Sequence, residues 1–429
     1  MLSALLSFTQ GTAKLLTLSL ALLCFTQPSF ADEVFSWKQC VDLATANNNN
    51  LKAAIENEKS TAYQRNATIS GFLPHATANL GSDRNATTRS NIISQTYTNS
   101  VSVTQNIFSG LQDVGKFDQA KANNMVSKAN ILLIKAQVSY DLKFSYQNLT
   151  YAKETVNLLD NIIRRRQDNL HIIELRFKSG MENKGSLLLA RAYLEQAKYD
   201  RLQGSNLIES ARAQLCKAMG LSDCQPFDIQ GTVPITTPSE KVDFGLITET
   251  TPQHLQATAQ EQAAKAGIII AESTFMPSID LTAAAGQRDT NIAQNSGYWT
   301  VGLNLSLPFF TGGKDYYTTQ SAYSIKAAAK ENRQTVDQQI LVSLKQTRNA
   351  YIEAIAKLKV DQSFQEAVRM RADIARSKYN NGLLSFEDWD VIETDLINRQ
   401  KFYLQSKLNR VVNEAAWEQA QGKGVFSHD

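Results

Sequence analysis

The chain has 429 residues, and its 44 basic and 41 acidic residues give a formal net charge of +3 at pH 7. The charges are spread along the chain and form no basic cluster, so composition does not indicate nucleic acid as a partner. Four scattered histidines, with no metal-ligand spacing, phosphate loop or nucleophile motif, argue against an enzyme. We predict no catalytic residue, no metal site and no cofactor.

Residues 1–31 have the pattern of a cleavable signal peptide. Lys14 precedes a short apolar run, Leu15–Phe25, and Ser29-Phe30-Ala31 places small residues at the first and third positions of the cleavage site. The mature chain is expected to be exported and to start near Asp32. Beyond Ala31 no stretch approaches the roughly 20 consecutive apolar residues of a membrane-spanning helix, so any membrane crossing would be made by strands.

The mature sequence is an internal repeat with an offset of about 202 positions, as between Gly180 and Gly382. Three motifs recur in order: Phe72-Leu73-Pro74 with Phe275-Met276-Pro277, Phe108-Ser109-Gly110 with Phe310-Thr311-Gly312, and Phe177–Gly180 with Tyr379–Gly382. We therefore divide the mature chain into a first repeat (32–224), a proline-containing linker (225–245), a second repeat (246–421) and a C-terminal tail (422–429).

Each repeat is predicted to begin with a helix, Trp37–Gly71 and Pro252–Phe275, that ends at a proline. Two strands follow in each repeat, separated by polar loops near 84–96 and 288–297.

The strand pattern is clearest after Gly297, where apolar residues alternate with polar ones at Trp299, Val301, Leu303, Leu305 and Leu307. A strand that crosses lipid needs roughly 9 to 11 residues with this alternation. Tyr298 and Trp299 begin the strand and are predicted to be membrane-interface aromatics.

After a glycine turn, each repeat is predicted to run as helix for about 70 residues, longer than an ordinary globular helix. A seven-residue spacing that indicates a coiled coil joins Leu142, Leu149, Val156, Ile163, Leu170 and Phe177, with Ser145, Ala152, Leu159 and Ile173 as a second stripe. Gly180 and Gly382 are predicted to end these helices, and returning helices to cover 183–219 and 385–421. Each repeat thus ends in a helical hairpin.

Four strands cannot close a membrane barrel, and an open edge in lipid would leave backbone groups unpaired at several kcal/mol each. Several copies must therefore pool their strands, and a conduit favours more than the eight that two copies supply. The amphipathic coils belong in water, where they can extend the barrel as a hollow helical cylinder. The predicted fold is mainly helical, with long coiled-coil hairpins and four strands per chain.

Three cysteines remain after the leader. Cys216 and Cys224 lie on either side of Gly220, in an exported chain where disulfides form, so a disulfide is one interpretation. In the other interpretation, Cys216 is a small core residue and Cys224 has no role. Cys40 would be unpaired.

These motifs, in order and twice, resemble the TolC family of outer-membrane efflux proteins over nearly the whole mature chain. The resemblance implies a homotrimer in outer-membrane lipid, with a 12-stranded β-barrel continuous with a periplasmic α-helical barrel. It also implies a periplasmic adaptor (membrane fusion) protein and an inner-membrane transporter of the RND, ABC or MFS type. The family more often has Asn-Pro where this chain has Asn49-Asn50.

The resemblance places gate candidates in the second hairpin. Asp388 matches a constricting aspartate and Tyr379 a gate tyrosine, whereas the second family aspartate is Val391 here and the gate arginine is Leu384. Asp390, next to Val391, could substitute. Each has another reading: Ser385 and Asp388 form a capping-box pattern, Tyr379 continues an apolar stripe, and Asp390 could be a solvated surface charge.

Four residues at the two bends, Gly180, Met181, Gly382 and Leu383, are predicted to form the adaptor-contacting tip, because apolar residues exposed there indicate docking. Folding back onto the hairpin is the alternative. The run Arg164-Arg165-Arg166 is expected to be solvated, with contact to an acidic adaptor as the other reading.

The sequence thus predicts the outer-membrane channel of a tripartite efflux pump or type I secretion system. The alternative is a soluble periplasmic coiled-coil scaffold or adaptor without a pore, whose strands form a small sandwich. The sequence identifies no cargo.

Overall fold

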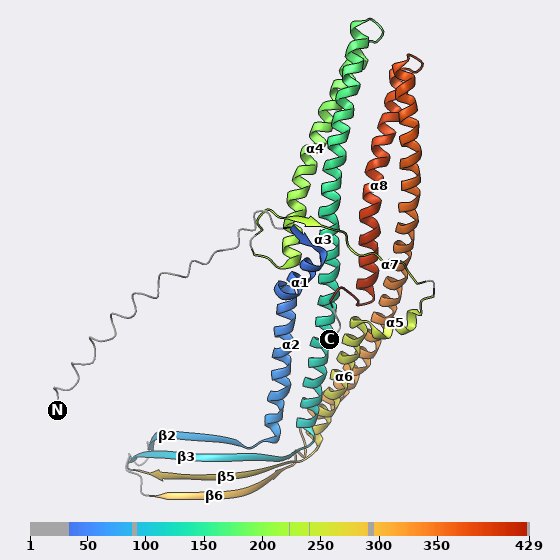
Figure 1. Ribbon diagram of the computed structural model, residues 1–429. Helices are drawn as coiled ribbons and strands as arrows, with labels where there is room; N and C mark the ends of the chain where they lie inside the picture. The colour runs from blue at the N-terminus through green and yellow to red at the C-terminus, as the bar shows by residue number, and fades with distance from the viewer. Residues whose placement is uncertain (1–33, 88–91, 223, 240, 291–295, 427–429) are drawn as a thin grey trace, which may run out of the picture.

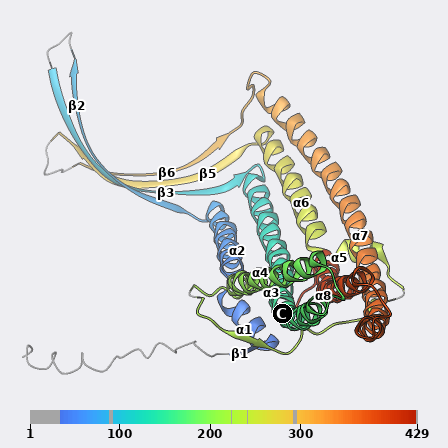
Figure 2. The same ribbon diagram turned by 90° about the horizontal axis from the view of Figure 1, so that it is seen from above.

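The computed structural model describes residues 34–87, 92–222, 224–239, 241–290 and 296–426, so the predicted signal peptide lies outside the described residues. Two long helical hairpins extend to one end of the molecule, a four-stranded sheet lies at the other, and shorter elements surround the middle (Figure 1). Viewed along the hairpins, the sheet is strongly curved (Figure 2).

The described residues of the first repeat form four α-helices. They are α1 (Trp37–Asn47), α2 (Asn49–Ala67), α3 (Gln112–Lys178) and α4 (Lys184–Met219). The second repeat also contains four: α5 (Phe244–Thr250), α6 (Pro252–Glu272), α7 (Lys314–Asn380) and α8 (Phe386–Ala420). Short 3-10 turns, η1 (Thr68–Phe72) and η2 (Ser273–Phe275), lead into the sheet.

Both α3 and α7 have 67 residues, which corresponds to about 100 Å of helix. The long helices and the hairpins were predicted and are present. Within the part of the chain that the structure describes, no helix has both the length and the apolar character needed to span a membrane.

The coiled-coil seam moves around α3 along its length. Leu142 and Leu149 are fully buried, but Phe177, on the same predicted stripe, is 38% exposed. Towards the tip the second stripe takes over, since Leu159 and Ile173 are buried. A straight helix drifts by roughly 20° per heptad, which carries one row of residues out of the seam and brings the next row in.

The predicted first helix is broken at Asn48. The Asn48 side-chain oxygen accepts hydrogen bonds from the N–H groups of Asn50 (3.0 Å) and Leu51 (3.1 Å), which caps α2. Its amide nitrogen donates to the carbonyl of Ala218 (3.0 Å), in the last turn of α4. One side chain thus joins the end of α4 to the start of α2, and the two helices follow one another along the uninterrupted α3.

The second repeat has an equivalent joint. Thr251 caps α6, and Pro252 is its first residue. A Cβ placed on Gly422, just beyond α8, would lie 2.1 Å from the Pro252 ring. The two caps, Asn48 and Thr251, are 203 positions apart, one more than the offset between the hairpin bends.

The large sheet has the antiparallel order β2-β3-β5-β6. Its strands are β2 (His75–Thr87), β3 (Ile92–Ser109), β5 (Ser278–Asp289) and β6 (Gly297–Ser306). The loop predicted near 84–96 was largely wrong, because β2 and β3 extend through most of it. Pairing across three strands aligns Val101 with Ala285 and Ala285 with Trp299, so the apolar residues of successive strands share one face.

The strands form a single open sheet that projects away from the helices (Figure 1). A small sandwich, expected if the chain were a soluble scaffold, is not what the structure contains. Ten consecutive residues of β6 are exposed. The edge strands of this sheet are β2 and β6.

A second, two-stranded parallel sheet in the middle of the molecule was not predicted. It pairs β1 (Val34–Ser36) with β4 (Asp228–Gln230) from the linker. The sheet packs on α3, where the Tyr146 hydroxyl donates to the Gln230 carbonyl at 2.8 Å. Phe35, Phe227 and Ile229 join Tyr146 in the largest apolar core of the chain. The linker therefore not only follows the first repeat in the chain but also packs into its core.

Candidate functional site

The two hairpin bends form the free ends of the helices, opposite the sheet (Figure 1). Gly180 and Gly382 both have φ of 74°, a left-handed conformation that strains other residues, and a Cβ at either position would meet no neighbouring atom. Backbone conformation, not space, is therefore what requires glycine. Beyond the bends, Met181 is 68% and Leu383 is 74% exposed, so neither folds back onto its hairpin.

Tyr379 is fully buried near the tip. Its ring stacks on Trp389, with centroids 4.2 Å apart and an angle of 16° between the planes. Both belong to an apolar cluster that draws Ile173 and Leu187 from the first hairpin and Phe386 from the second. Tyr379 is thus a core residue, as its place in the apolar stripe suggested, and the core is shared by both hairpins.

Polar contacts to Tyr379 come from the first hairpin. The Tyr379 hydroxyl donates to Glu182 Oε2 at 3.0 Å, and the Arg176 guanidinium lies 4.6 Å from the ring centroid. Arg176 Nη1 also donates to the Tyr379 carbonyl at 2.8 Å. Burial, reinforced by Glu182, raises the pKa of Tyr379, so its hydroxyl remains a donor. We call Arg176, Glu182 and Tyr379 the tip latch.

Asp388 lies in the first turn of α8 and is exposed. Its N–H donates to Ser385 Oγ at 3.1 Å, and the Ser385 hydroxyl donates to Asp388 Oδ2 at 2.9 Å. Ser385 is therefore the cap of α8, and the Asp388 carboxylate bonds the Ser385 hydroxyl instead of the backbone N–H that a complete capping box would use. Its match to a constricting aspartate remains a prediction.

Asp390 is largely buried and paired, which corrects the reading of it as a solvated surface charge; its reading as a substitute gate residue remains a prediction. It accepts a hydrogen bond from Arg166 Nη1 at 3.0 Å, and the two side chains are 13% and 9% exposed. Arg166 also lies 4.5 Å from the Tyr193 ring centroid. Arg165 pairs with Glu393, one helical turn beyond Asp390. Since residues 390 and 393 share the face of α8 that meets α3, they cannot point where Asp388 does.

The expectation of a solvated arginine run was therefore wrong for Arg165 and Arg166. It holds for Arg164, which is exposed and bonds Asn161 of its own helix. The sequence did contain one signal for the ion pairs: basic residues on one coil and acidic residues one helical turn apart on the other, Asp390 and Glu393, are complementary in charge. Sequence reasoning also missed Trp389 as the ring partner of Tyr379, for which no such signal was available.

Cys216 and Cys224 are joined by a disulfide that spans the end of α4. Cys40 is a free thiol in the same apolar core as Cys216, and burial raises its pKa to about 12. On β6, Tyr298 is 39% and Trp299 78% exposed. Within the described ranges, no group of three or more His, Cys, Asp or Glu residues could hold a metal ion.

Both repeats of the chain match known proteins. The model of the family described as "Outer membrane efflux protein" matches residues 40–221 and 246–423. The chain is 22% identical to the "Probable outer membrane lipoprotein SilC" of Salmonella typhimurium over 397 residues, which cover 89% of this chain and 84% of SilC. It is 25% identical to the "Cation efflux system protein CusC" of Escherichia coli K12 over 315 residues, 69% of this chain and 65% of CusC.

The fold agrees with solved structures as well. The crystal structure of the Campylobacter jejuni CmeC outer membrane channel superposes with a TM-score of 0.82 at 19% identity, over 92% of this chain and 87% of CmeC. Two family matches, one per repeat, together span most of the sequence. The chain belongs to the outer membrane efflux protein family, the family of TolC-like channels.

Proposed function

We propose that three copies of this chain form an outer-membrane outlet that passively conducts small molecules or polypeptides. The cargo would be supplied by an inner-membrane transporter of the RND, ABC or MFS type, as in a tripartite pump or a type I secretion system. The helices would stand in the periplasm, and the chain would catalyse no reaction. The observation that carries the proposal is that the elements lie side by side in the same order in the sheet, in the helices next to the sheet and in the helices near the tip.

The same order is found at each level. In the sheet it is β2-β3-β5-β6. Beside the sheet, α3 packs against α2 and α6, and α6 packs against α7. Towards the tip, α3 packs against α4 and α8, and α8 against α7. Each level therefore begins with an element of the first repeat and ends with one of the second.

One copy is therefore a layer of elements with two different edges. One edge is formed by β2, α2 and α4, and the other by β6 and α7. Joining unlike edges is a heterologous contact, which closes into a ring when the rotation per copy allows it. One contact type would then complete sheet and helices together. Exposed apolar residues along α7 (Val360, Phe364, Met370 and Ile374) and α4 (Leu188, Tyr199 and Leu202) support contact at these edges.

The number of copies follows from the sheet. Two copies would give eight strands, whose interior side chains fill, whereas three give twelve and leave a lumen. The curvature of the sheet (Figure 2) supports closure. Its apolar face, with Val301, Leu303 and Leu305, would meet lipid, and its hydroxyl- and amide-rich face would line the lumen.

The assembly can be tested on membranes. Outer-membrane detergent extracts should yield an oligomer whose mass, by native mass spectrometry, is three times that of one chain, and it should open channels in planar bilayers. Recovery of the whole protein in the soluble periplasm, or a stable monomer in detergent, would contradict the proposal and favour the pore-less scaffold.

For the gate, we propose that the Asp388 carboxylates of three copies ring the constriction at the tip, with the tip latch holding the hairpins closed. Asp388→Ala should then raise single-channel conductance or weaken block by multivalent cations. Glu387→Ala is the matched control, because it removes the same charge from the neighbouring exposed position. If conductance and block are unchanged, Asp388 has only its capping role.

The tip residues Met181 and Leu383 are proposed to dock a periplasmic adaptor, since both are exposed apolar side chains at the end of the molecule. Met181→Asp and Leu383→Asp should weaken co-purification with the adaptor while leaving conductance in bilayers unchanged. Co-purification that survives both changes would place the adaptor elsewhere.

A further inference from the structure

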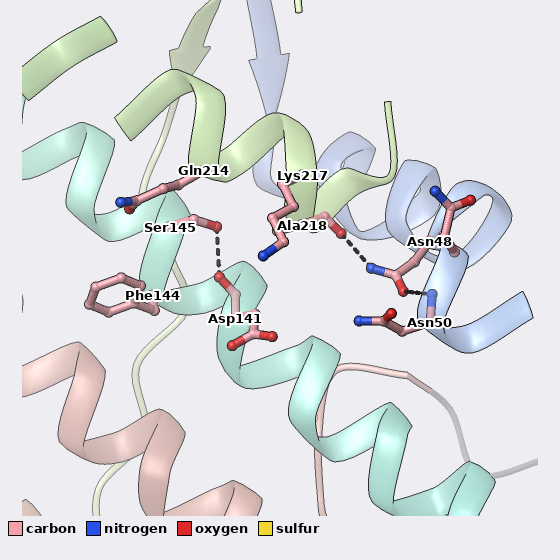
Figure 3. Close-up of a pocket in the computed structure, with 9 residues that line it drawn as sticks. Asn48, Asn50, Asp141, Phe144, Ser145, Gln214, Lys217 and Ala218 are labelled. Carbon is pink, nitrogen blue, oxygen red and sulfur yellow. Dashed lines mark hydrogen bonds between the residues drawn. The ribbon is translucent and has the colours of Figure 1, made fainter. Parts of the chain in front are cut away.

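A cavity of about 330 Å³ lies at the joint between α2, α3 and α4 (Figure 3), which is in the middle of the molecule, between the hairpin bends and the sheet (Figure 1). This volume is in the range of small-molecule sites. Most of its lining residues are polar: Asn48 before α2, Asp141 and Ser145 on α3, and Gln214 and Lys217 on α4. Apolar atoms nevertheless make up slightly more of the lining surface than polar ones, and Phe144 is one of the apolar side chains that line it.

One wall of the cavity is fixed by the joint itself. Asn48 is 6% exposed and bonded on both sides, to Ala218 of α4 and to the first turn of α2. Residues at the N-terminus of α2 line the cavity, and although the N–H groups of Asn50 and Leu51 are already bonded to Asn48, the helix dipole there favours negative charge, while that of the α4 C-terminus favours positive charge. Two helix ends of opposite polarity meet at one small site.

Asp141 is held in place at one oxygen and free at the other. Its Oδ1 accepts from Gln137 at 2.9 Å, and Gln137 in turn accepts from Gln419 of α8 at 2.5 Å. Among the described residues, Oδ2 accepts no hydrogen bond. Burial raises the pKa of Asp141, and the opposing effects of the Gln137 hydrogen bond and, to a smaller extent, of the Lys217 charge do not cancel it. The carboxylate is thus partly desolvated and incompletely paired.

Lys217 faces the same space from α4 (Figure 3). No ion pair within 4 Å forms between its ammonium and a carboxylate of the described residues, Asp141 included. The cavity therefore presents a carboxylate and an ammonium that influence each other across it without touching.

The second repeat provides an internal control for this pair. At an offset of 202, the counterparts of Asp141 and Lys217 are Ser343 and Gln419. The second joint also has a side-chain cap, Thr251, but there α6 meets the end of α8 by packing of Pro252 against Gly422, and neither charge is present. The charged pair is therefore not needed to join the two helices.

We propose that this cavity binds a small zwitterion of the α-amino-acid type, with its ammonium group at Asp141 and its carboxylate at Lys217 and the start of α2. A simple cation would be repelled by Lys217, and a simple anion by Asp141. The side-chain NH2 group of Gln214 favours a polar side chain on the ligand. A divalent metal is not favoured, because a single carboxylate supplies the only charged oxygen ligands.

Equilibrium dialysis of the full chain in detergent, with radiolabelled L-glutamine as the probe, tests the proposal. We expect one saturable site per chain. Asp141→Asn and Lys217→Gln should each weaken binding by about tenfold or more, since each removes one charge-assisted contact. N-acetyl-L-glutamine, which lacks the ammonium group, should not compete.

The charge-reversed double variant Asp141→Lys, Lys217→Asp gives a sharper readout, because a zwitterion can turn around. It should bind more tightly than either charge-neutral single variant. Asp160→Asn is the control: Asp160 also lies on α3 and pairs with a residue of α4, Arg201 at 2.6 Å, but away from the cavity.

No saturable binding up to millimolar glutamine, binding indifferent to both single variants, or equal competition by N-acetyl-L-glutamine would overturn the proposal. Helical content by circular dichroism identifies a variant that fails to fold, and the charge-reversed pair then decides. Channel conductance is expected to be the same in all these variants, so failure here is distinguishable from failure of the conduit.

Discussion

The two hairpins have the same shape but different interiors. Their long helices are equal in length, and their bends use glycine with the same φ. At equivalent positions, however, Leu159 of the first hairpin corresponds to Asp361 of the second, and Gly204 to Ser406. The repeat maintains lengths and turns, whereas the chemistry of the seam is exchangeable.

In the first hairpin the exchange gives close apolar packing. A Cβ on Gly204 would lie 3.3 Å from Leu159, so a small residue on one helix accommodates a large one on the other. In the second hairpin Asp361, 1% exposed, accepts hydrogen bonds from Lys357 and from Ser406. The same pair of positions is filled once by shape and once by charge.

The second hairpin also binds the linker through buried charges. Arg410 and Glu414 form an ion pair with side chains 7% and 2% exposed. Glu414 accepts from both the N–H and the hydroxyl of Thr236 at 2.7 Å, and Arg410 donates to the Thr236 carbonyl at 2.6 Å. Tyr351 donates to the same carbonyl. The linker thus contacts apolar residues of both repeats, and only in the second repeat does it also bind a fully buried ion pair.

The largest effect is expected at Glu414. Glu414→Ala leaves Arg410 buried without its partner, so the free energy of unfolding should fall by about 3–5 kcal/mol. Urea unfolding followed by circular dichroism measures it. Glu209→Ala, an exposed acid on α4, should change stability by less than about 0.5 kcal/mol. Equal effects of the two changes would contradict the contrast between the hairpins.

A smaller loss of stability is expected at the disulfide, which belongs to the first repeat alone. Cys216→Ser should lower the free energy of unfolding by roughly 2–3 kcal/mol, because an eight-residue separation closes a small loop in the unfolded chain. The urea midpoint of the parent chain should respond to reductant, and that of the variant should not. Iodoacetamide should leave Cys40 unmodified at pH 8, since its pKa is raised to about 12.

At Asp361 the expected effect depends on pH. Burial alone would raise its pKa, but the hydrogen bonds from Lys357 and Ser406 outweigh it and lower the pKa. Because the pKa is lower in the folded chain, the carboxylate stabilises the fold above its unfolded pKa of about 3.9, and this is lost as pH falls through the folded pKa. Asp361→Asn should cost about 1.5–3 kcal/mol at pH 7 and progressively less in acid.

The first hairpin supplies the control. The double change Asp361→Leu with Ser406→Gly gives the second hairpin the residues that the first has at the equivalent positions, Leu159 and Gly204. This double variant should lose the part of the pH dependence of stability that Asp361 causes. It should also regain most of the free energy of unfolding that Asp361→Leu alone loses. If Asp361→Asn lowers the free energy of unfolding equally at pH 3 and pH 7, the ionised carboxylate does not stabilise the fold and the prediction is wrong.

The smallest expected change in stability is at the tip latch. Tyr379→Phe keeps the stacking on Trp389 but removes the hydrogen bond to Glu182, for a loss of about 1 kcal/mol. If the latch holds the hairpins closed, open probability in planar bilayers should rise despite this small cost. Tyr403→Phe on α8, away from the tip, should change neither.

The repeat, the long helices and the bends could be predicted, because period, length and glycine placement are local properties of the sequence. The break at Asn48 could not, since a helix N-cap in the middle of a helical pattern is set by what it meets, here Ala218 of another helix. The partners of Arg166 and Tyr379 were missed for the same reason. They lie 224 and 197 positions away, so only the packing of one hairpin on the other brings them together.

The joint at Asn48 has a mechanical consequence. Above and below it, α3 continues as one rod, but its neighbour changes from α2 to α4, which the Asn48 side chain joins. Because α4 and α2 are separate helices whereas α3 and α7 are unbroken, a rotation of α4 at the free end is not carried rigidly into α2; only α3 and α7 connect that end directly to the strands. On the side of the chain formed by α4 and α2, the end nearest the sheet can therefore stay in place while the far end turns.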